Sequence, residues 1–312
     1  MKAMDLRQLR YFIKIVDCGN MTRAAEALNI AQPALSQQIG NLESDLGVKL
    51  FDRSVHGVKA TRSGELLYRY ARDILRQAAN AREAMHRETD RPGGRVAVAM
   101  PSSTARMVTA ALFLEMRGRY PDITLEFVEN TSAELPGQVM QGRVDLAVVT
   151  VDLPIRGLVL QPIIREDLFV LMHPNVNWSG RLMTLRELAK LPIILPSPPN
   201  NIRARIDLGF SKAGLQYEVV AEASTTPLLI STVKSGAGVT ILPLSAISEE
   251  PFGSIRVARI TNPSLSRELS VCTSAAFPLS LASEKVREVL IELMRTLIKT
   301  KKWRGAKLLG SK

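Results

Sequence analysis

The stretch Arg91-Pro92-Gly93-Gly94 divides the sequence into two parts with different hydrophobic patterns. Proline and glycine together interrupt regular structure, so this stretch predicts a linker. After it, short β-branched runs alternate with helical patterns, which is typical of an α/β domain built on a parallel sheet. The chain has 312 residues, more than one hydrophobic core usually serves, so two or three domains are expected.

Three short helices are predicted upstream of this linker. The first carries apolar residues at helical spacing and ends at Gly19. The second runs from about Thr22 to Leu28, and Asn29 after it tolerates the left-handed backbone of a tight turn. The third begins near Pro33 and closes at Gly47. The last two helices, joined by so short a turn, form a helix-turn-helix.

A hairpin wing is expected next, over residues 49–53 and 57–62, followed by one long helix from Ser63 to about Glu88. No proline interrupts this helix, and Ser63 can cap its start. Its apolar residues follow the heptad spacing of a coiled coil, which predicts a dimer. The alternative is a single long core helix. The expected dimer seam consists of Leu67, Tyr70, Ile74, Ala78, Ala81 and Met85.

Strands and helices alternate after the linker. Strands are expected at residues 96–100, 124–128, 146–150, 168–172, 192–195, 219–222, 239–242 and 268–272. Helices are expected at residues 104–119, 132–141, 202–213, 227–234 and 282–299.

Hydroxyl side chains cluster where several of these strands end. Open α/β sheets bind ligands at the carboxyl ends of their strands, where helix N-termini offer N–H groups to a small anion or polar molecule. A serine or threonine there is also an ordinary helix cap, so the cluster and no single member carries the prediction. Arg106 and Arg203 are expected either to clamp an anion or to lie on solvated faces. The expected ligand-binding residues are Ser102, Ser103, Thr104, Thr131, Thr150, Ser197 and Thr226.

Basic residues gather at the two ends of the chain. The sequence has 41 lysines and arginines against 30 acidic residues, a net charge of +11. A basic N-terminal module suits phosphate contacts, although basic ends also serve solubility. From Arg295 onward there are seven basic residues and no acidic one. This end is expected to be frayed and solvated; the alternatives are that it finishes the last helix, braces a neighbouring subunit or touches DNA.

Location and cysteine use point to an ordinary cytoplasmic protein. No apolar run is long enough to span a bilayer, and charges of both signs interrupt the first residues, so neither a membrane partner nor a secretion signal is predicted. Cys18 and Cys272 lie far apart and are expected to be small buried hydrophobes.

Enzymatic function finds little support in the motifs. Ser231-Thr232-Val233-Lys234 has the S-x-x-K spacing of acyl-transferring enzymes, but the S-D-N and K-T-G partners are absent. The three histidines, His56, His86 and His173, are too scattered for a catalytic triad or a metal site. Phosphate-binding glycine motifs do not occur. The chain is therefore predicted not to be an enzyme and to hold no cofactor or metal.

Residues 9–62 carry a dense family resemblance. The matching residues are Tyr11-Phe12, Ala24-Ala25-Glu26-Ala27-Leu28, Gln32-Pro33-Ala34-Leu35-Ser36-Gln37-Gln38-Ile39, Leu42-Glu43, Leu46-Gly47, Leu50-Phe51 and Arg53. They resemble the DNA-binding domain of the LysR-type transcriptional regulators. The effector-domain signatures of that family are similar to Gly142-Arg143-Val144-Asp145-Leu146-Ala147, His173-Pro174 and Gly236-Ala237-Gly238-Val239-Thr240-Ile241-Leu242-Pro243. Within the family, members of the nitrogen-assimilation-control type are similar to this chain at Ile15-Val16-Asp17, Ala31-Gln32-Pro33 and Ser36-Gln37-Gln38.

The resemblance implies a fold in three parts. These are an all-α winged helix-turn-helix at residues 1–62, a linker and dimerisation helix at 63–91, and a periplasmic-binding-protein-like effector domain at 92–312. The effector domain would consist of two α/β subdomains, subdomain I at about 92–162 and 268–312 and subdomain II at about 163–267. Two crossovers, near 161–164 and 267–269, would form its hinge.

The resemblance also implies partners. It predicts a bacterial homodimer or homotetramer on dyad sites in promoter DNA, hence association with the nucleoid, and contact with RNA polymerase. A small metabolite between the two effector subdomains would alter DNA bending. Its identity is open: a carboxylate or sulfate-like ester suits the expected donors, whereas an uncharged effector, or none, is the alternative.

The family places the third helix in the major groove. Glutamine there suits adenine, and Pro33 or Ala34 can meet a thymine methyl group. Gln37 and Gly40-Asn41 stand where family members often have basic residues, so fewer charged contacts are expected. The implied base-contacting residues are Gln32, Pro33, Ala34, Ser36 and Gln37, and the implied phosphate-contacting residues are Arg23, Arg53, Lys59 and Arg62.

Two other functions stay open on the sequence. The C-terminal part could be a ligand-independent oligomerisation scaffold, with DNA binding controlled by protein level or by a partner. It could also be an α/β enzyme joined to a DNA-binding module, which would require turnover of a small substrate. The first alternative predicts no stabilisation by any metabolite.

Overall fold

The computed structural model describes residues 4–54, 57–85, 92–151, 154–248, 253–276 and 278–310. Internal contacts divide the chain into two units, Met1–Thr89 and Asp90–Lys312. The expected linker at 91–94 falls close to this division, and its first residue lies outside the described part. Among the described residues, no helix is long and apolar enough to cross a membrane.

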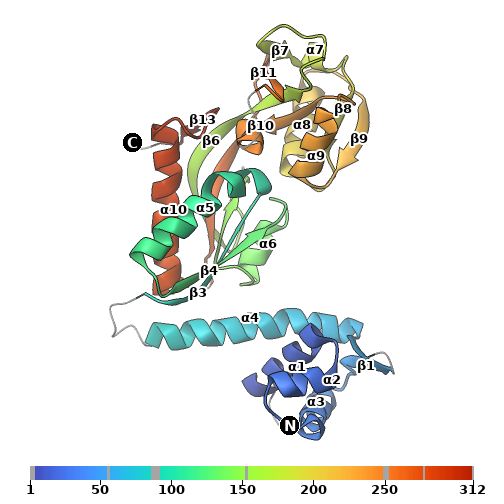
Figure 1. Ribbon diagram of the computed structural model, residues 1–312, viewed down its shortest axis with the longest axis vertical. Helices are drawn as coiled ribbons and strands as arrows, with labels where there is room; N and C mark the ends of the chain where they lie inside the picture. Colours follow the sequence, from blue (N-terminus) through green and yellow to red (C-terminus); the bar gives the residue numbers. More distant parts are fainter. Residues whose placement is uncertain are drawn as a thin grey trace. The chain divides into compact units, whose positions relative to one another are not determined.

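The first unit is a winged helix-turn-helix followed by one long helix (Figure 1). The predicted helices are confirmed, with described ends that differ by about one residue; the expected end of the long helix near Glu88 lies outside the described residues. Gly19 and Gly47 end their helices in the left-handed conformation, and Asn29 has the expected positive φ of 55°. The elements are α1 (Leu6–Cys18), α2 (Met21–Ala27), α3 (Gln32–Leu46), β1 (Phe51–Ser54), β2 (Gly57–Ala60) and α4 (Arg62–Met85).

A single small core holds these elements together. Phe12 of α1 and Phe51 of β1 are buried, with their ring centroids 5.1 Å apart. Leu35 and Ile39 bring α3 onto them, and the fully buried Ala71 brings α4. Helix α3, the wing and the long helix therefore share one hydrophobic core.

The start of α4 corrects one prediction. The helix begins at Arg62, and Thr61 caps it by accepting the N–H of Gly64 at 3.0 Å, so Ser63 is not the cap. A Cβ on Gly64 would lie 2.1 Å from the carbonyl oxygen of Leu50. Only glycine lets α4 approach the start of the wing this closely.

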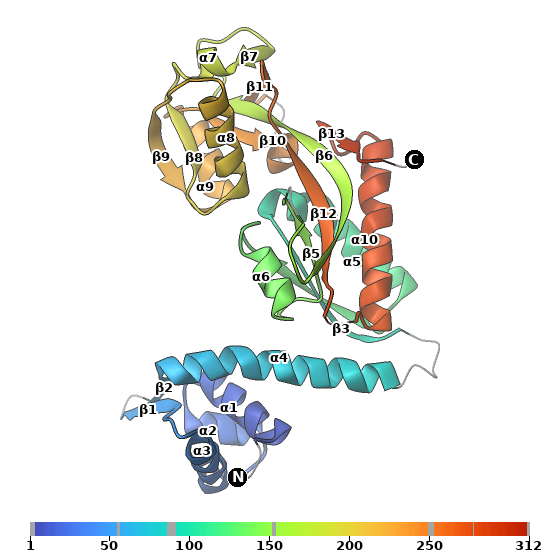
Figure 2. The ribbon, with the colours of Figure 1, turned by 180° about the vertical axis from the view of Figure 1, so that it is seen from behind.

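The second unit contains two α/β lobes joined by long strands (Figures 1 and 2). Its main sheet has the order β4-β3-β5-β12-β6-β11-β7, with β10 and β13 also paired to β6. The strands are β3 (Gly94–Met100), β4 (Ile123–Glu129), β5 (Leu146–Val149), β6 (Leu158–Met172), β7 (Leu182–Thr184), β8 (Ile193–Pro196), β9 (Val219–Ala223), β10 (Thr240–Pro243), β11 (Arg256–Thr261), β12 (Ser266–Ser274) and β13 (Ala306–Leu308).

All five helices expected in this unit are present, and the short helices α7 and η1 are additional to them. The expected helix at 132–141 is shorter than predicted. It begins at Leu135, so that Pro136 lies in its first turn, and it ends at Met140. The helices are α5 (Ser102–Arg119), α6 (Leu135–Met140), α7 (Leu185–Leu188), α8 (Asn201–Lys212), α9 (Thr226–Lys234), the 3₁₀ helix η1 (Leu244–Ile247) and α10 (Leu281–Lys299).

The first lobe is a three-layer sandwich. Val96 and Val98 of β3 face the core beneath α5 and α10, whereas Ala97 and Ala99 face the core beneath α6. This alternation follows from the two-residue period of a strand whose two faces are both covered. Cys272 of β12 lies fully buried on the α6 side.

The sheet is mixed, which corrects the expectation of a parallel one. Strand β3 is parallel to β4 and β5, but β12 runs antiparallel to both β5 and β6. Strands β10 and β11 are also antiparallel to β6, while β8 and β9 form a separate parallel pair. The strands β7, β11 and β13 and residues 158–167 of β6 are additional to the expected strands.

The two lobes have separate cores, and β6 and β12 pass from one to the other. Ile164 belongs to the core of the first lobe and Leu168 to that of the second. On the returning strand, Leu265 belongs to the second and Leu269 to the first. The crossover on β6 thus lies at residues 165–167, beyond the expected hinge at 161–164, because Ile164 is packed inside the first lobe.

The basic C-terminal segment is folded, which corrects the expectation of a frayed end. After α10 the chain turns through Lys301, which has a positive φ of 58°, and buries Trp303. Strand β13 then pairs antiparallel with β6 at residues 164–166. The basic side chains of Lys301, Lys302 and Arg304 stay exposed while the backbone is docked.

Glu43 links α3 to the wing. Its side chain is 6% exposed, and Oε1 accepts the N–H groups of Leu50 at 2.8 Å and Phe51 at 3.3 Å. Its Oε2 accepts from Lys49 Nζ at 2.9 Å. Burial alone would raise the pKa of Glu43, but these hydrogen bonds outweigh it and hold the pKa below its usual value.

We predict that Glu43→Ala destabilises the first unit by about 1–3 kcal/mol, because the buried N–H groups of Leu50 and Phe51 lose their acceptor. A lowered folded pKa stabilises above the unfolded pKa, so this contribution should fade as pH falls below about 4.5. Both tryptophans, Trp178 and Trp303, lie in the second unit. Urea unfolding followed by circular dichroism, with tryptophan fluorescence in parallel, therefore separates the two units.

The control for this measurement is Asp45→Asn, on the exposed side of the same helix. It should leave both transitions in place. An equal shift of the tryptophan transition in Glu43→Ala would contradict the assignment to the first unit.

Candidate functional site

The N-terminal turns of α3 form an exposed polar surface. Helix α3 has Pro33 in its first turn and no side-chain cap, so its first N–H groups are open. Gln32, Pro33, Ala34 and Gln37 are exposed, while Leu35 and Ile39 face the core. This spacing presents the predicted base-contacting residues on one side of the helix, together with Ser36, which is half-buried.

The predicted phosphate-contacting residues lie on α2, on the wing and at the start of α4. Lys59 on β2 and Arg62 at the start of α4 are exposed. Arg23 is exposed too, but its Nη2 donates to the carbonyl oxygen of Cys18 at 2.6 Å. Arg53 lies on β1, and its side chain falls outside the described part.

The expected dimer seam divides between two sides of α4. Leu67 packs against the core of the first unit, whereas Tyr70 and Ile74 are 59% and 36% exposed. Ala78 is half-buried, Ala81 is exposed, and the side chain of Met85 lies outside the described part. Sequence reasoning missed Leu66, which is 47% exposed beside Tyr70 on the same side of the helix.

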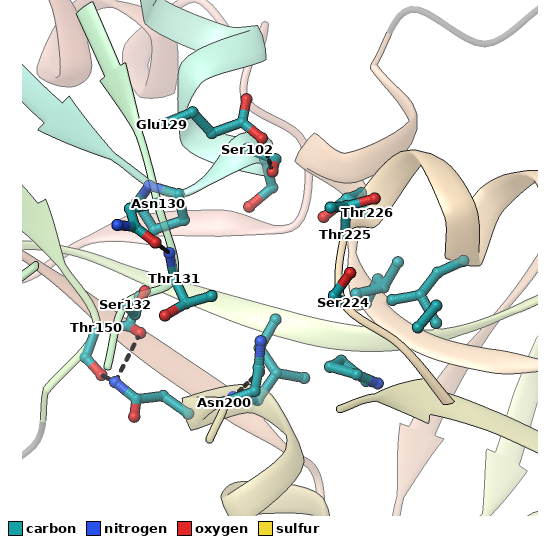
Figure 3. A pocket seen from close by; sticks show the side chains of 18 of the residues that line it. Ser102, Glu129, Asn130, Thr131, Ser132, Thr150, Asn200, Ser224, Thr225 and Thr226 are labelled. Carbon is teal, nitrogen blue, oxygen red and sulfur yellow. Dashed lines mark hydrogen bonds between the residues drawn. The ribbon is translucent and has the colours of Figure 1, made fainter. Parts of the chain in front are cut away.

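A polar cavity of about 280 Å³ lies between the two lobes of the second unit (Figure 3). Three helices, α5, α8 and α9, begin at its wall. The N-termini of α5 and α9 have no side-chain cap, so their first N–H groups and the positive ends of their helix dipoles are open, whereas Asn200 already accepts the N–H groups of Ile202 and Arg203 in α8. The wall also includes the carboxyl ends of β3, β4, β8 and β9, where an α/β sheet places its ligands.

Five of the seven expected ligand-binding residues line this cavity. Figure 3 shows the first lobe contributing one wall and the segment 224–226 facing it from the second lobe. The lining residues that sequence analysis singled out are Ser102, Ser103, Thr131, Thr150 and Thr226.

Thr104 and Ser197 do not line the cavity. Thr104 is fully buried, because it lies a further 100° around α5 from Ser103 and so turns into the lobe. Ser197 follows β8, where its N–H donates to the carbonyl oxygen of Ala223, and its side chain is not at the wall. Proximity to a strand end was therefore too coarse a criterion for these two residues.

The expected arginine clamps are also absent from the wall. Arg203 is engaged elsewhere: Nε donates to Asp207 at 2.9 Å and Nη1 to Glu222 at 2.6 Å. The hydrogen bond to Glu222 is the largest cause of a raised Arg203 pKa. Arg106 does not line the cavity either.

The arginine at the cavity is Arg267, which the sequence placed only in a crossover. Its Nη2 donates to Ser103 Oγ at 2.7 Å and to Glu166 Oε2 at 2.7 Å. Arg267 and Glu166 are 2% and 0% exposed, so the guanidinium charge is balanced inside the protein. No local signal could have found this pair, because its partners are far apart in sequence.

Amide and carboxylate groups complete the wall. Ser102 Oγ donates to Glu129 Oε1 at 2.5 Å, which places a carboxylate beside the start of α5. Asn201 Nδ2 donates to the carbonyl oxygen of Thr150 at 2.7 Å, joining the two lobes. With Arg267 neutralised by Glu166, the cavity offers hydroxyls and helix N-termini rather than excess positive charge.

One hydroxyl at the wall has no partner. Thr131 Oγ1 is buried and makes no hydrogen bond among the described residues. A buried polar atom left unsatisfied costs stability, so its persistence beside a cavity suits a group that bonds to a ligand. Thr104 Oγ1 is likewise unpartnered but lies away from the wall, which makes it a matched reference.

Cysteine and metal chemistry find no centre in the described residues. Burial raises the pKa of the Cys272 thiol to about 12, so it stays protonated and inert, whereas Cys18 is half-buried. Among the residues the structure describes, no group of three or more histidine, cysteine or acidic residues could hold a metal ion.

Comparison with family models finds two matches. Residues 6–65 match the family described as bacterial regulatory helix-turn-helix protein, lysR family. Residues 89–295 match the LysR substrate binding domain.

Characterised relatives match nearly the whole chain. The chain is 35% identical to the nitrogen assimilation regulatory protein Nac of Escherichia coli, over 96% of this chain and 98% of that protein. It is also 35% identical to Nac of Klebsiella aerogenes, over 93% and 95%. A probable RuBisCO transcriptional regulator of Cyanophora paradoxa is 30% identical over 86% of each chain.

Solved structures share the fold at lower identity. Full-length OxyR of Pseudomonas aeruginosa matches with a TM-score of 0.73 and 23% identity, covering 100% of both chains. CbnR, described as a LysR family transcriptional regulator, matches with a TM-score of 0.72 and 23% identity, covering 93% of this chain and 99% of that one.

Proposed function

The chain belongs to the LysR family of bacterial regulatory helix-turn-helix proteins, which are transcriptional regulators and not enzymes, and we propose how its parts divide the work. The N-terminal unit binds promoter DNA through α3, and a small molecule in the cavity of the second unit modulates that binding. The single observation that carries the ligand proposal is the buried, unpartnered Thr131 Oγ1 at a wall where three helices begin.

Helix α3 enters the major groove with its N-terminal turns. Gln32, Ser36 and Gln37 read base edges, and Pro33 and Ala34 supply apolar contacts. Lys59 and Arg62, with Arg53 and Arg23, hold the phosphate backbone on both sides of the groove. The exposed polar surface of α3 supports this arrangement, as does the solved complex of CbnR with its target DNA, a protein of the same fold.

The oligomer forms through α4. Leu66, Tyr70 and Ile74 leave an apolar stripe uncovered on a helix whose other side is already packed, and a second copy of α4 would cover it. A homodimer, or a homotetramer built from two dimers, then binds dyad sites beside promoters and contacts RNA polymerase. We place the protein in the bacterial cytoplasm, on the nucleoid when bound, and its similarity to Nac makes nitrogen assimilation promoters the first targets to examine.

The ligand is a small polar molecule. A cavity of about 280 Å³ is slightly smaller than typical small-molecule sites, which span roughly 300–1,000 Å³. Helix N-termini and hydroxyls suit an acceptor such as a carboxylate, and Glu129 suits a donor on the same molecule. A highly charged anion fits less well, because Arg267 is already neutralised.

DNA recognition is tested first with double-stranded sites selected from a random library. Gln32→Ala should flatten the base preference, because a bidentate contact to a base is worth about 1–3 kcal/mol of discrimination. Lys59→Ala should weaken all sequences equally and lower the salt slope by about one. The control is Ser44→Ala, at the exposed far end of α3. An unchanged preference in Gln32→Ala would reject the base-contact assignment.

The dimer proposal predicts that Ile74→Asp lowers the mass measured by sedimentation to that of one chain, because a charge would be buried in the seam. The control is Ala79→Asp, an exposed position five residues farther along and on another side of the helix. A mass that stays dimeric in Ile74→Asp would place the interface elsewhere.

Ligand binding is tested by thermal shift against small carboxylates, sulfate esters, amino acids and sugars. A compound at about 100 times its Kd should add about 2.7 kcal/mol. Thr131→Val should raise the melting temperature of the free protein, since it removes an unsatisfied polar atom, yet abolish the shift. Thr104→Val should stabilise likewise but keep the shift. Stabilisation by no compound would favour the ligand-independent scaffold.

A further inference from the structure

The segment from Trp303 to Leu309 lies beyond the family match, which ends at residue 295, and it docks on the crossover strand β6. Asp167 N–H donates to the carbonyl oxygen of Gly305 at 2.8 Å, and Leu309 N–H donates to that of Ile163 at 2.9 Å. Gly305 has a positive φ of 72°, and a Cβ there would lie 2.8 Å from the ring of Phe169. The segment is thus fitted closely to one place on β6.

The docked segment completes the hydrogen bonding of Glu166. Trp303 Nε1 donates to Glu166 Oε1 at 2.8 Å, and Arg267 Nε donates to Oε2 at 2.9 Å. Both Trp303 and Glu166 are buried, at 2% and 0% exposure. Each carboxylate oxygen therefore has its own donor, and the carboxylate plane is fixed from two sides.

Arg267 connects Glu166 to the wall of the cavity. Its hydrogen bonds use Nε and Nη2, the latter reaching Ser103 Oγ at 2.7 Å. Among the described residues Nη1 has no hydrogen-bond partner, although Arg267 lines the cavity. The guanidinium is thus held by two of its nitrogens, and the third has no protein partner among the described residues.

We propose that Trp303 is a positioning residue for the cavity: through Glu166 it fixes the guanidinium of Arg267, which presents Nη1 to an acceptor group of the ligand. The C-terminal segment and the cavity wall at Ser103 then form one coupled unit. The ligand role of Nη1 rests on the proposed function, whereas the coupling itself does not.

The coupling follows from the burial of Glu166, Arg267 and Trp303. Without the indole N–H, Glu166 Oε1 would be buried without a donor, and its carboxylate would rotate toward any other donor. Arg267 would follow, because a buried guanidinium stays with its counter-charge. Outer-shell partners of this kind act on affinity, by about 10–100-fold where they orient metal ligands.

The coupling can be read in the full-length protein without any ligand. Nitrogen-15 spectra contain two indole N–H signals, from Trp178 and Trp303, and Trp178→Phe assigns them. Ser103→Ala should move the Trp303 signal and leave that of Trp178 in place. Ser103→Thr, which keeps the hydroxyl, should restore the original position.

The reverse direction uses the Nε–H signal of Arg267, assigned by Arg267→Lys. Trp303→Phe keeps an aromatic ring in place but removes the donor, and should speed hydrogen exchange of Arg267 Nε–H by about tenfold, the effect of one lost hydrogen bond on the local opening equilibrium. Glu166→Gln should do the same with the indole intact. Ser283→Ala, another buried serine of the first lobe with its own partner Ser280, is the control and should change neither signal.

The outcomes are distinct. Movement of the Trp303 signal in Ser103→Ala, together with faster exchange of Arg267 in Trp303→Phe, supports the coupling. An unmoved Trp303 signal, or equal exchange in Trp303→Phe and Ser283→Ala, overturns it. Because no ligand is needed, a failed coupling leaves the thermal-shift test untouched, and an empty ligand panel leaves the coupling standing.

Discussion

The buried ion pair between Glu166 and Arg267 is the constraint on which the second unit depends. The two residues face each other in the register of β6 and β12, where both strands leave one lobe for the other. Two charges in a dry interior persist when they are paired and held by further hydrogen bonds; Trp303 donates one to Glu166, and Ser103 accepts one from Arg267. Removing one partner of such a pair typically costs about 3–5 kcal/mol. The crossover, the C-terminal segment and a wall of the cavity are therefore held by one set of hydrogen bonds.

The cavity next to this pair is left incomplete. Helices α5, α8 and α9 direct their N-termini at it, and Asn201 bridges the lobes to Thr150. Yet Thr131 Oγ1 has no partner among the described residues. The surrounding hydrogen bonds stabilise the site, whereas the unsatisfied hydroxyl of Thr131 destabilises it. Such local losses of stability are expected at functional sites. Because the surrounding residues are held by their own hydrogen bonds, they do not move to satisfy the hydroxyl of Thr131.

Local signals in the sequence were enough for much of the fold. Helices α1 to α3 follow from apolar spacing and from Gly19, Asn29 and Gly47, and five lining residues follow from hydroxyls at strand ends. What the sequence could not show depends on pairing across distance. Glu166, Arg267 and Trp303 are joined only by the folded sheet, and β13 is a strand only because β6 accepts it. Thr104 failed for another reason: one residue turns a helical side chain by 100°.

Both units secure a functional surface with a buried carboxylate. Glu43 fixes the wing to the recognition helix by accepting from Leu50, Phe51 and Lys49, and Glu166 fixes the cavity arginine to the C-terminal segment. A carboxylate can serve this purpose because it accepts several donors at once and its charge strengthens each bond. In both places the groups that would meet DNA or ligand are held by a residue that touches neither. Substitutions at Glu43 and Glu166 should therefore change recognition through geometry, whereas exposed groups such as Lys59 act through their own contacts.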